Sequence, residues 1–342
     1  MSSQLSERQG MLRPWNRSKF CRRGRQAEEN EMLPKLFKLL QIAALGAALA
    51  MTSVSLPAMA QDQQGVPTMK QQELASSGYA EGAEGLQIYY ETYGEGEPIV
   101  VLAGGLMSIK TTAQITRPLS EQRQVIAVDL EGHGRTGLRD TPMSHERNGD
   151  DIASVLRHLG ISKADVAGYS HGADAAIWMA IRHPEMVRNL IVISTALSRD
   201  GWYPEAQEGM SAVGASLAEQ MKGTPIFEDY GHPDQFPQFL DRMGELMKKD
   251  WDWRDEVRAL QMPVLLIFAD HDSVSMEHIA EFFALFGGGI REPGWIDPKF
   301  SQARLAIIPG YSHYNLGQGP EVAEVIERFL TRPTSPATQF AP

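Results

Sequence analysis

Short runs of Val, Ile and Leu recur along the chain from about residue 86, and longer stretches of mixed polarity separate them. Successive positions in each run are apolar, so a strand made from it would be buried on both faces, as in a parallel sheet covered by helices. The intervening stretches predict helices at 149–159, 173–183 and 276–286. Residues 86–93 alternate instead, which predicts an antiparallel edge hairpin. The runs predict buried strands at Ile99–Leu102, Val125–Val128, Asp165–Ala167, Leu190–Ser194, Val264–Phe268 and Leu305–Ile308.

The interval 196–260 has no strand-like run. It is too long for a structureless loop in a compact α/β unit, so it predicts a few helices that form an inserted lid. Its aromatic residues could form the core of that lid or line a substrate pocket. They are Trp202, Tyr203, Phe227, Tyr230, Phe236, Phe239, Trp251 and Trp253.

The first 60 residues follow a different pattern. Residues 32–60 combine a short basic segment, an apolar core and an Ala-Met-Ala end, which are the parts of a secretory signal peptide. We therefore expect cleavage after Ala60 and a periplasmic or secreted protein, with an uncleaved membrane anchor as the alternative. We further expect 1–31 to be an upstream extension that translation from Met32 would omit, 61–80 a polar linker, 81–330 the folded domain and 331–342 a flexible tail.

Composition and charge narrow the class of protein. The 342 residues are 42% apolar and 22% charged, which is typical of a folded globular chain. The net charge is −11, and the residues after 60 carry 23 positive and 39 negative charges, a net of −16. A surface with this much negative charge repels phosphate backbones and anionic lipid head groups. We therefore expect no nucleic-acid partner and, after signal cleavage, no membrane partner. The single Cys21 lies upstream, which leaves no thiol nucleophile, thiolate metal site or disulfide in the mature chain.

The sequence Gly168-Tyr169-Ser170-His171-Gly172 joins a predicted buried strand to a predicted helix. This G-x-S-x-G pattern makes a turn too tight for side chains at the two glycine positions, and it holds the serine hydroxyl clear of the backbone. In that context Ser170 is a candidate nucleophile.

A serine hydroxyl needs a histidine and a carboxylate to become a nucleophile. Two further predicted strands end in such residues, the first in Asp270-His271-Asp272 and the second in Pro309-Gly310-Tyr311-Ser312-His313. The carboxyl ends of parallel strands meet at one edge of a sheet, so these side chains are expected close to Ser170. Asp270, His271 and Asp272 with His278 could also be read as metal ligands, but one turn supplies too few independent ligands, so we expect no metal.

Together with the serine turn, four stretches resemble the α/β-hydrolase superfamily: Val100 to Gly105, Asp129 to Gly134 and the two histidine-containing strand ends. The resemblance runs from about residue 86 to 330 and is closest to the serine branch of esterases, cofactor-free haloperoxidase-like perhydrolases and carbon-carbon bond hydrolases. It implies an α/β fold with a mostly parallel sheet, helices on both faces and an inserted lid. Within the stretch Asp129 to Gly134, we expect His133 to brace a loop beside the site, with a direct catalytic role as the alternative.

The resemblance assigns roles by position. Ser170 matches the nucleophile, His313 the base, and Asp272, rather than Asp270, the acid. The oxyanion donors would be the backbone N–H groups of Gly105 and His171. We expect the substrate pocket to be lined by Leu106, Met107, Trp202 and Tyr203.

The expected activity is hydrolysis of a small to medium carboxylic ester through an acyl-enzyme, with no cofactor. The alternatives are perhydrolysis, carbon-carbon bond hydrolysis or a lyase reaction on the same triad, or a ligand-binding protein that turns over slowly. The oligomeric state is left open.

Overall fold

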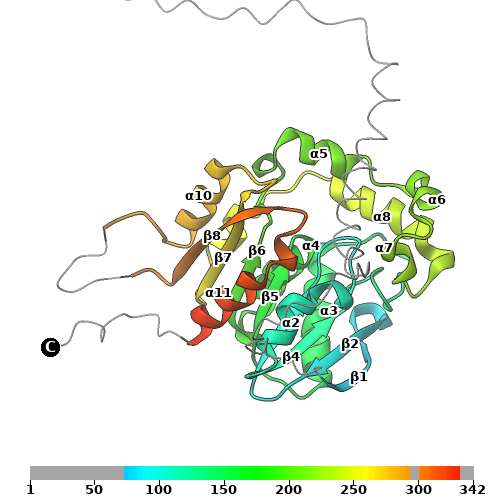
Figure 1. The fold of residues 1–342 in the computed structure, drawn as a ribbon, viewed down its shortest axis with the longest axis horizontal. Coiled ribbons are helices and arrows are strands. Elements are labelled where there is room, and N and C mark those ends of the chain that lie inside the picture. Colours follow the sequence, from blue (N-terminus) through cyan, green and yellow to red (C-terminus); the bar gives the residue numbers. More distant parts are fainter. Residues whose placement is uncertain (1–72, 293–299, 332–342) are drawn as a thin grey trace, which may run out of the picture. The chain divides into compact units, whose positions relative to one another are not determined.

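The computed structural model describes residues 73–292 and 300–331, and these residues build one sheet of eight strands in the order β1-β2-β4-β3-β5-β6-β7-β8 (Figure 1). From β3 onward every neighbouring pair is parallel, whereas β2 is antiparallel to both β1 and β4. The strands are β1 (Leu74–Glu81), β2 (Gln87–Tyr93), β3 (Glu97–Leu102), β4 (Arg123–Val128), β5 (Ala164–Tyr169), β6 (Val187–Ile193), β7 (Val264–His271) and β8 (Ala303–Ser312).

Both faces of the sheet are buried. Along β3, Val100 and Leu102 belong to one hydrophobic cluster, and Ile99 and Val101 belong to another on the opposite face. Strand side chains alternate between faces, so the continuous apolar runs supply both clusters at once. The predicted parallel sheet is therefore confirmed.

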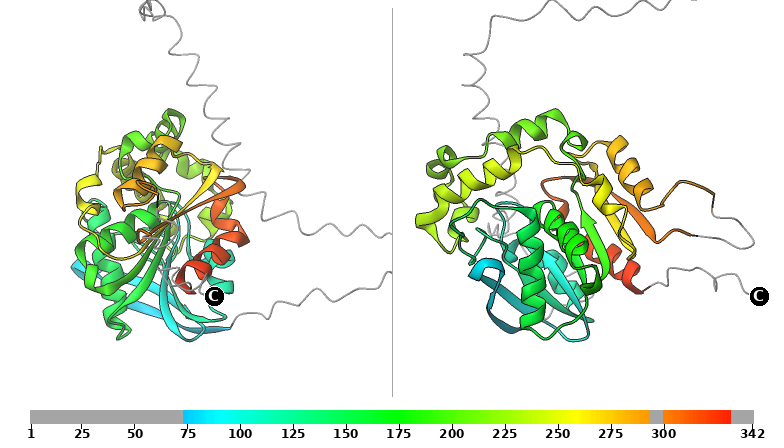
Figure 2. Two further views of the ribbon diagram at one scale, coloured as in Figure 1. Left: turned by 90° about the vertical axis from the view of Figure 1, so that its left-hand side faces the viewer. Right: turned by 180° about the vertical axis from the view of Figure 1, so that it is seen from behind.

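Helices cover the two faces, as Figure 2 shows from behind and from the side. The helices α3 (His145–His158), α4 (His171–Arg182) and α10 (Met276–Leu285) bury their apolar residues in the first cluster, and α2 (Ala113–Leu119) and α11 (Pro320–Thr331) bury theirs in the second. No helix of the described residues is long and apolar enough to cross a membrane.

The interval between β6 and β7 is helical, as predicted. It contains α5 (Pro204–Ser211), α6 (Ala218–Met221), α7 (Pro225–Glu228), α8 (Phe236–Lys248) and α9 (Arg254–Val257). On α8, Phe236, Phe239 and Met243 recur at helical spacing and are fully or almost fully buried, and Tyr230 stacks on Phe239 with ring centroids 5.4 Å apart. These aromatic residues form a core of the inserted helices, one of the two roles left open by the sequence.

One boundary of the sequence analysis was wrong. Residues 74–80 belong to β1 and not to a polar linker. In β1, Ala80 is the fully buried residue, and most of the other residues are exposed at the edge of the sheet. An edge strand of this kind carries no apolar alternation, which is why its sequence resembled a linker. The predicted upstream extension, the signal peptide, the first part of the linker up to residue 72 and the tail from 332 lie outside the described residues.

Candidate active site

Ser170 lies on a tight turn between β5 and α4, with φ 52° and ψ −120°. A Cβ atom at Gly168 would lie 2.1 Å from the carbonyl oxygen of Gly172, and one at Gly172 would lie 2.4 Å from the carbonyl oxygen of Ala103. Both contacts are to backbone, which cannot move aside, so glycine is required at both positions. The turn leaves Ser170 partly exposed at the carboxyl edge of the sheet.

The structure brings His313 to that hydroxyl. The Nε2 atom of His313, which follows β8, lies 3.2 Å from the Ser170 Oγ atom. The indole ring of Trp202 packs edge-on against the imidazole, with ring centroids 5.1 Å apart, and the ring of Tyr169 stacks on it at 5.7 Å. These rings hold the imidazole against the serine.

Asp272 follows β7 and lies behind His313. Its carboxylate accepts hydrogen bonds from the backbone amides of Ala269 at 3.0 Å and Val274 at 3.2 Å. Burial raises the pKa of the Asp272 carboxyl, but its interactions with His313 and the amide of Ala269 outweigh burial and hold the pKa below its usual value. Asp272 is thus an anion placed behind the imidazole.

Asp270, the competing carboxylate, has a different environment. Its side chain is 34% exposed, pairs with His271 at 3.0 Å and accepts the backbone amide of Gly310 at 2.8 Å. Its hydrogen bond with Gly310 therefore ties the end of β7 to the neighbouring strand β8. Of the two aspartates, Asp272 is the one in ion-pair distance of His313.

Ser194 is a site residue that the sequence analysis missed. It follows β6, is fully buried and has φ 53°. Its Oγ atom lies 2.7 Å from His313 Nδ1 and 2.8 and 2.9 Å from the two carboxylate oxygens of Asp272. The signal that could have found it is its position at the carboxyl end of a predicted strand beside the strand that carries Ser170.

The backbone amides predicted to stabilise the oxyanion are available to donate hydrogen bonds. Within the described residues, the backbone N–H groups of Gly105 and His171 have no hydrogen-bond partner. The next amide, of Leu106, donates instead to His133 Nε2 at 3.1 Å, and Leu106 has φ 62°. Burial lowers the pKa of His133 to about 4, so the ring is neutral and can accept this bond. The prediction that His133 braces a loop is confirmed by that contact.

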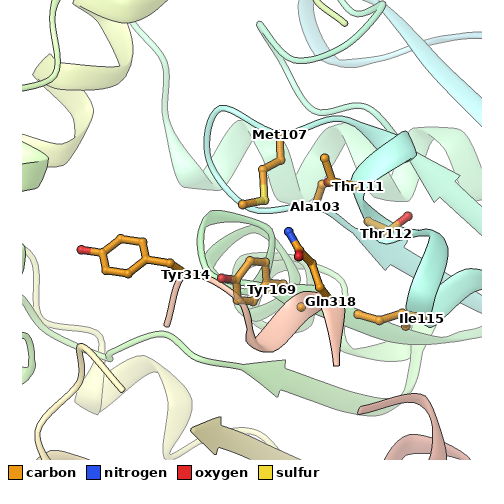
Figure 3. Close-up of a pocket in the computed structure, with 9 residues that line it drawn as sticks. Ala103, Met107, Thr111, Thr112, Ile115, Tyr169, Tyr314 and Gln318 are labelled. Carbon is orange, nitrogen blue, oxygen red and sulfur yellow. The ribbon is translucent and has the colours of Figure 1, made fainter. Parts of the chain in front are cut away.

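The four predicted pocket residues lie in different places. Trp202 packs against His313. Met107 lines a cavity with Tyr169 and Tyr314, shown in Figure 3 between the loop after β3 and the segment after β8. Leu106 packs against the core of the inserted helices, and Tyr203 is 43% exposed.

A second group of titratable side chains lies beside the serine turn. Asp174 Oδ2 is 3.9 Å from the Nδ1 atoms of both His145 and His171, and Asp174 Oδ1 accepts a hydrogen bond from Thr195 at 2.6 Å. Burial raises the pKa of Asp174 to about 8 against the opposing bond from Thr195. Burial also lowers the pKa of His145 to about 4 and that of His171 well below its usual value. This group is therefore uncharged near neutral pH.

The same three residues have donors that suit a metal ion. Their ligand atoms lie within 4.8 Å of one another. Imidazole nitrogens and a carboxylate oxygen are usual zinc ligands, but donors around a tetrahedral zinc ion are roughly 3.4 Å apart. The group would therefore have to contract before it held an ion.

Comparisons with known proteins agree with this architecture. The family described as "alpha/beta hydrolase fold" matches residues 97–229. A putative carbamate hydrolase RutD of Azorhizobium caulinodans is 34% identical over 60% of this chain and 84% of its own length. A putative esterase/lipase of Haemophilus influenzae is 26% identical over 69% of this chain and 84% of its own length.

A solved structure gives the same result for the fold. A thermophilic esterase from Thermogutta terrifontis is 21% identical and superposes with a TM-score of 0.60 over 75% of this chain and 98% of its own. Its sheet-and-helix arrangement is thus shared at low sequence identity. The family match, the 34% identical relative and the serine turn between β5 and α4 establish that the chain belongs to the α/β-hydrolase family.

Proposed function

We propose that this chain is a serine hydrolase that cleaves small to medium carboxylic esters through an acyl-enzyme. The observation that carries the proposal is the 3.2 Å contact between Ser170 Oγ and His313 Nε2 on a strained strand-to-helix turn. A hydroxyl held this way beside an imidazole nitrogen that can accept its proton is an activated nucleophile. Relatives named as an esterase/lipase and a carbamate hydrolase support attack on an acyl carbonyl.

In the proposed reaction, His313 Nε2 takes the Ser170 proton as Oγ attacks the ester carbonyl carbon. The free amides of Gly105 and His171 stabilise the negative charge that develops on the carbonyl oxygen. His313 then gives the proton to the leaving alcohol, and a water molecule activated by the same nitrogen releases the acid. Asp272 stabilises the imidazolium that forms in both steps.

The decisive test is covalent labelling by a fluorophosphonate probe, which reacts with activated serines. The wild-type chain should be labelled, and Ser170→Ala should not. The chain offers a matched control, because Gly310-Tyr311-Ser312-His313 repeats the four residues Gly168 to His171. Ser312 bonds to Asn315 instead of a base, so Ser312→Ala should keep the label. Labelling of Ser170→Ala, or none of the wild type, would contradict the proposal.

A panel of p-nitrophenyl esters of graded acyl length defines the substrate and separates the alternatives. Fast turnover that peaks at short or medium length is the expected result. Peroxide-dependent oxidation at a rate above ester hydrolysis would instead indicate a perhydrolase. Ligand-induced melting shifts without turnover would indicate a binding protein of the same fold.

A further inference from the structure

The hydroxyl of Ser194 occupies the space between the base and the acid of the proposed triad. It lies 2.7 Å from His313 Nδ1 and 2.8 and 2.9 Å from the carboxylate oxygens of Asp272. The direct separation between His313 Nδ1 and Asp272 Oδ1 is 3.7 Å. A hydrogen bond needs about 3.2 Å or less, so the imidazole and the carboxylate are within ion-pair distance but share no direct hydrogen bond.

We propose that Ser194 is a positioning residue that links Asp272 to His313 through its hydroxyl. The His313 Nδ1–H donates to Ser194 Oγ, and the Ser194 O–H donates to Asp272. A serine hydroxyl has one donor and two acceptor positions, so it can accept from the ring and donate to the carboxylate at the same time. This inference rests on the proposed serine hydrolase function.

The hydrogen-bond directions follow from the partners. Asp272 is ionised and has only acceptors, so the Ser194 hydrogen must point to it. Ser194 Oγ can then only accept from the ring, which fixes the hydrogen on Nδ1. Nε2 is left as the acceptor that faces Ser170, which is the tautomer a general base requires.

The backbone holds Ser194 in this place. Its amide donates to the carbonyl oxygen of Ile267 on β7 at 2.9 Å, and the carbonyl of the preceding Ile193 accepts the Ser170 amide at 2.8 Å. The end of β6 is therefore tied to the strands that carry the acid and the nucleophile. Ser194 has φ 53°, an uncommon conformation for a residue other than glycine, and such strain persists where the surroundings enforce it.

The other groups around the imidazole cannot replace the hydroxyl. The rings of Trp202, Tyr169 and Tyr314 pack against it, with centroids 5.1, 5.7 and 5.4 Å away. The Tyr169 hydroxyl donates to the His313 carbonyl rather than to the ring. Asp272 is the charged group in ion-pair range of the ring among the described residues. Because Ser194 is fully buried, bulk water cannot take over its role.

The test is a double-mutant cycle with Ser194→Ala and Asp272→Asn, measured as kcat/KM on the best p-nitrophenyl ester. Ser194→Ala alone should lower kcat/KM by about 10- to 100-fold, as expected for a lost hydrogen bond to a charged group. In the Asp272→Asn background, Ser194→Ala should lower kcat/KM by less than about threefold, because the Ser194 hydroxyl no longer donates to a charged carboxylate. A purely structural role would give the same loss in both backgrounds.

The pH profile gives a second readout. Ser194→Ala should move the acid limb of the kcat/KM profile to lower pH, because the imidazolium loses its hydrogen-bond acceptor. Thr195→Val is the matched control, since it removes the neighbouring buried hydroxyl, which bonds to Asp174 instead. That variant should leave the acid limb in place. Ser194→Gly suits the positive φ and serves if the alanine variant fails to fold.

Three results would each overturn the inference: an unchanged kcat/KM in Ser194→Ala, additive effects in the double-mutant cycle, or an acid limb that does not move. The proposed function would still stand in these cases if the wild type takes the fluorophosphonate label. A wild type that takes no label and hydrolyses no ester would instead contradict the proposed function. The proton NMR spectrum needs no turnover. The link predicts a protected, downfield Nδ1–H signal that is absent in both His313→Gln and Ser194→Gly. Persistence of that signal in Ser194→Gly would also overturn the inference.

Discussion

Replacing Asp174 by asparagine should make the protein more stable at alkaline pH. Burial raises the pKa of Asp174 to about 8, although the Thr195 hydroxyl bonds to it. In the unfolded chain the same carboxyl titrates at about 3.9. Between these values the folded state keeps a proton that the unfolded state has lost, so stability falls as pH rises. Asparagine has the same shape, cannot ionise and can still accept the bond from Thr195.

The magnitude follows from the width of that pH window. The raised pKa corresponds to roughly four units, and each unit is about 1.4 kcal/mol, so the full loss is at most about 6 kcal/mol. The Asp174 side chain is 13% exposed, and water at that opening makes this figure an upper limit. Between pH 5 and pH 8 we expect the wild type to lose about 2 to 4 kcal/mol relative to Asp174→Asn.

The assay is urea unfolding followed by fluorescence, at pH 5, 6, 7, 8 and 9, with both proteins in the same buffers. Comparing the two proteins cancels every other titrating group. Asp150→Asn is a control of opposite sign, because bonds from Arg182 and His183 outweigh burial and lower the pKa of Asp150. Its stability deficit relative to the wild type should be complete above the unfolded pKa of about 3.9, and should therefore stay constant from pH 5 to pH 9. Parallel stability curves for the wild type and Asp174→Asn would refute the reasoning.

Three further substitutions test the turn and the acid. Gly172→Ala should destabilise the fold by about 3 kcal/mol or more, because its Cβ would lie 2.4 Å from a backbone oxygen; ordinary urea stability would contradict this. Ser170→Gly should have a free energy of unfolding about 1 kcal/mol higher than Ser170→Ala, because glycine tolerates φ 52° and alanine does not; equal stability of the two variants would disprove the strain. Asp272→Asn should lower kcat by roughly a thousandfold or more, and Asp270→Asn by less than about threefold; the reverse ranking would reassign the acid.

The central sheet could be predicted from sequence because its strands are buried on both faces. Runs such as Val264–Phe268 are apolar at every position, and no polar alternation is needed to identify them. The edge strand β1 could not be predicted in the same way. Its residues Leu74–Glu81 are mostly exposed, and its pairing to β2 depends on backbone hydrogen bonds that small polar residues make as well as any others.

The main site residues could be predicted because each one follows a predicted strand. Ser170, Asp272 and His313 each follow a predicted parallel strand, so topology alone brings them to one edge. Ser194 follows a predicted strand too, but no motif marks it. Its contact with His313 depends on strand register and on the left-handed backbone at that residue. Asp174 was missed because its environment comes from helices and a strand end far apart in sequence.

The end of β6 explains how two aspartates beside one serine, both with largely buried side chains, can carry different charges. Ser194 bonds to Asp272 and the next residue, Thr195, bonds to Asp174, so each carboxylate receives one hydroxyl from this strand end. Asp272 also receives two backbone amides and faces His313, and its pKa is low. Asp174 accepts a hydrogen bond from the Thr195 hydroxyl, but the two histidines beside it are kept neutral by burial, and its pKa is high. The groups that face each carboxylate, above all His313 beside Asp272, therefore decide which aspartate can stabilise an imidazolium, rather than depth of burial alone.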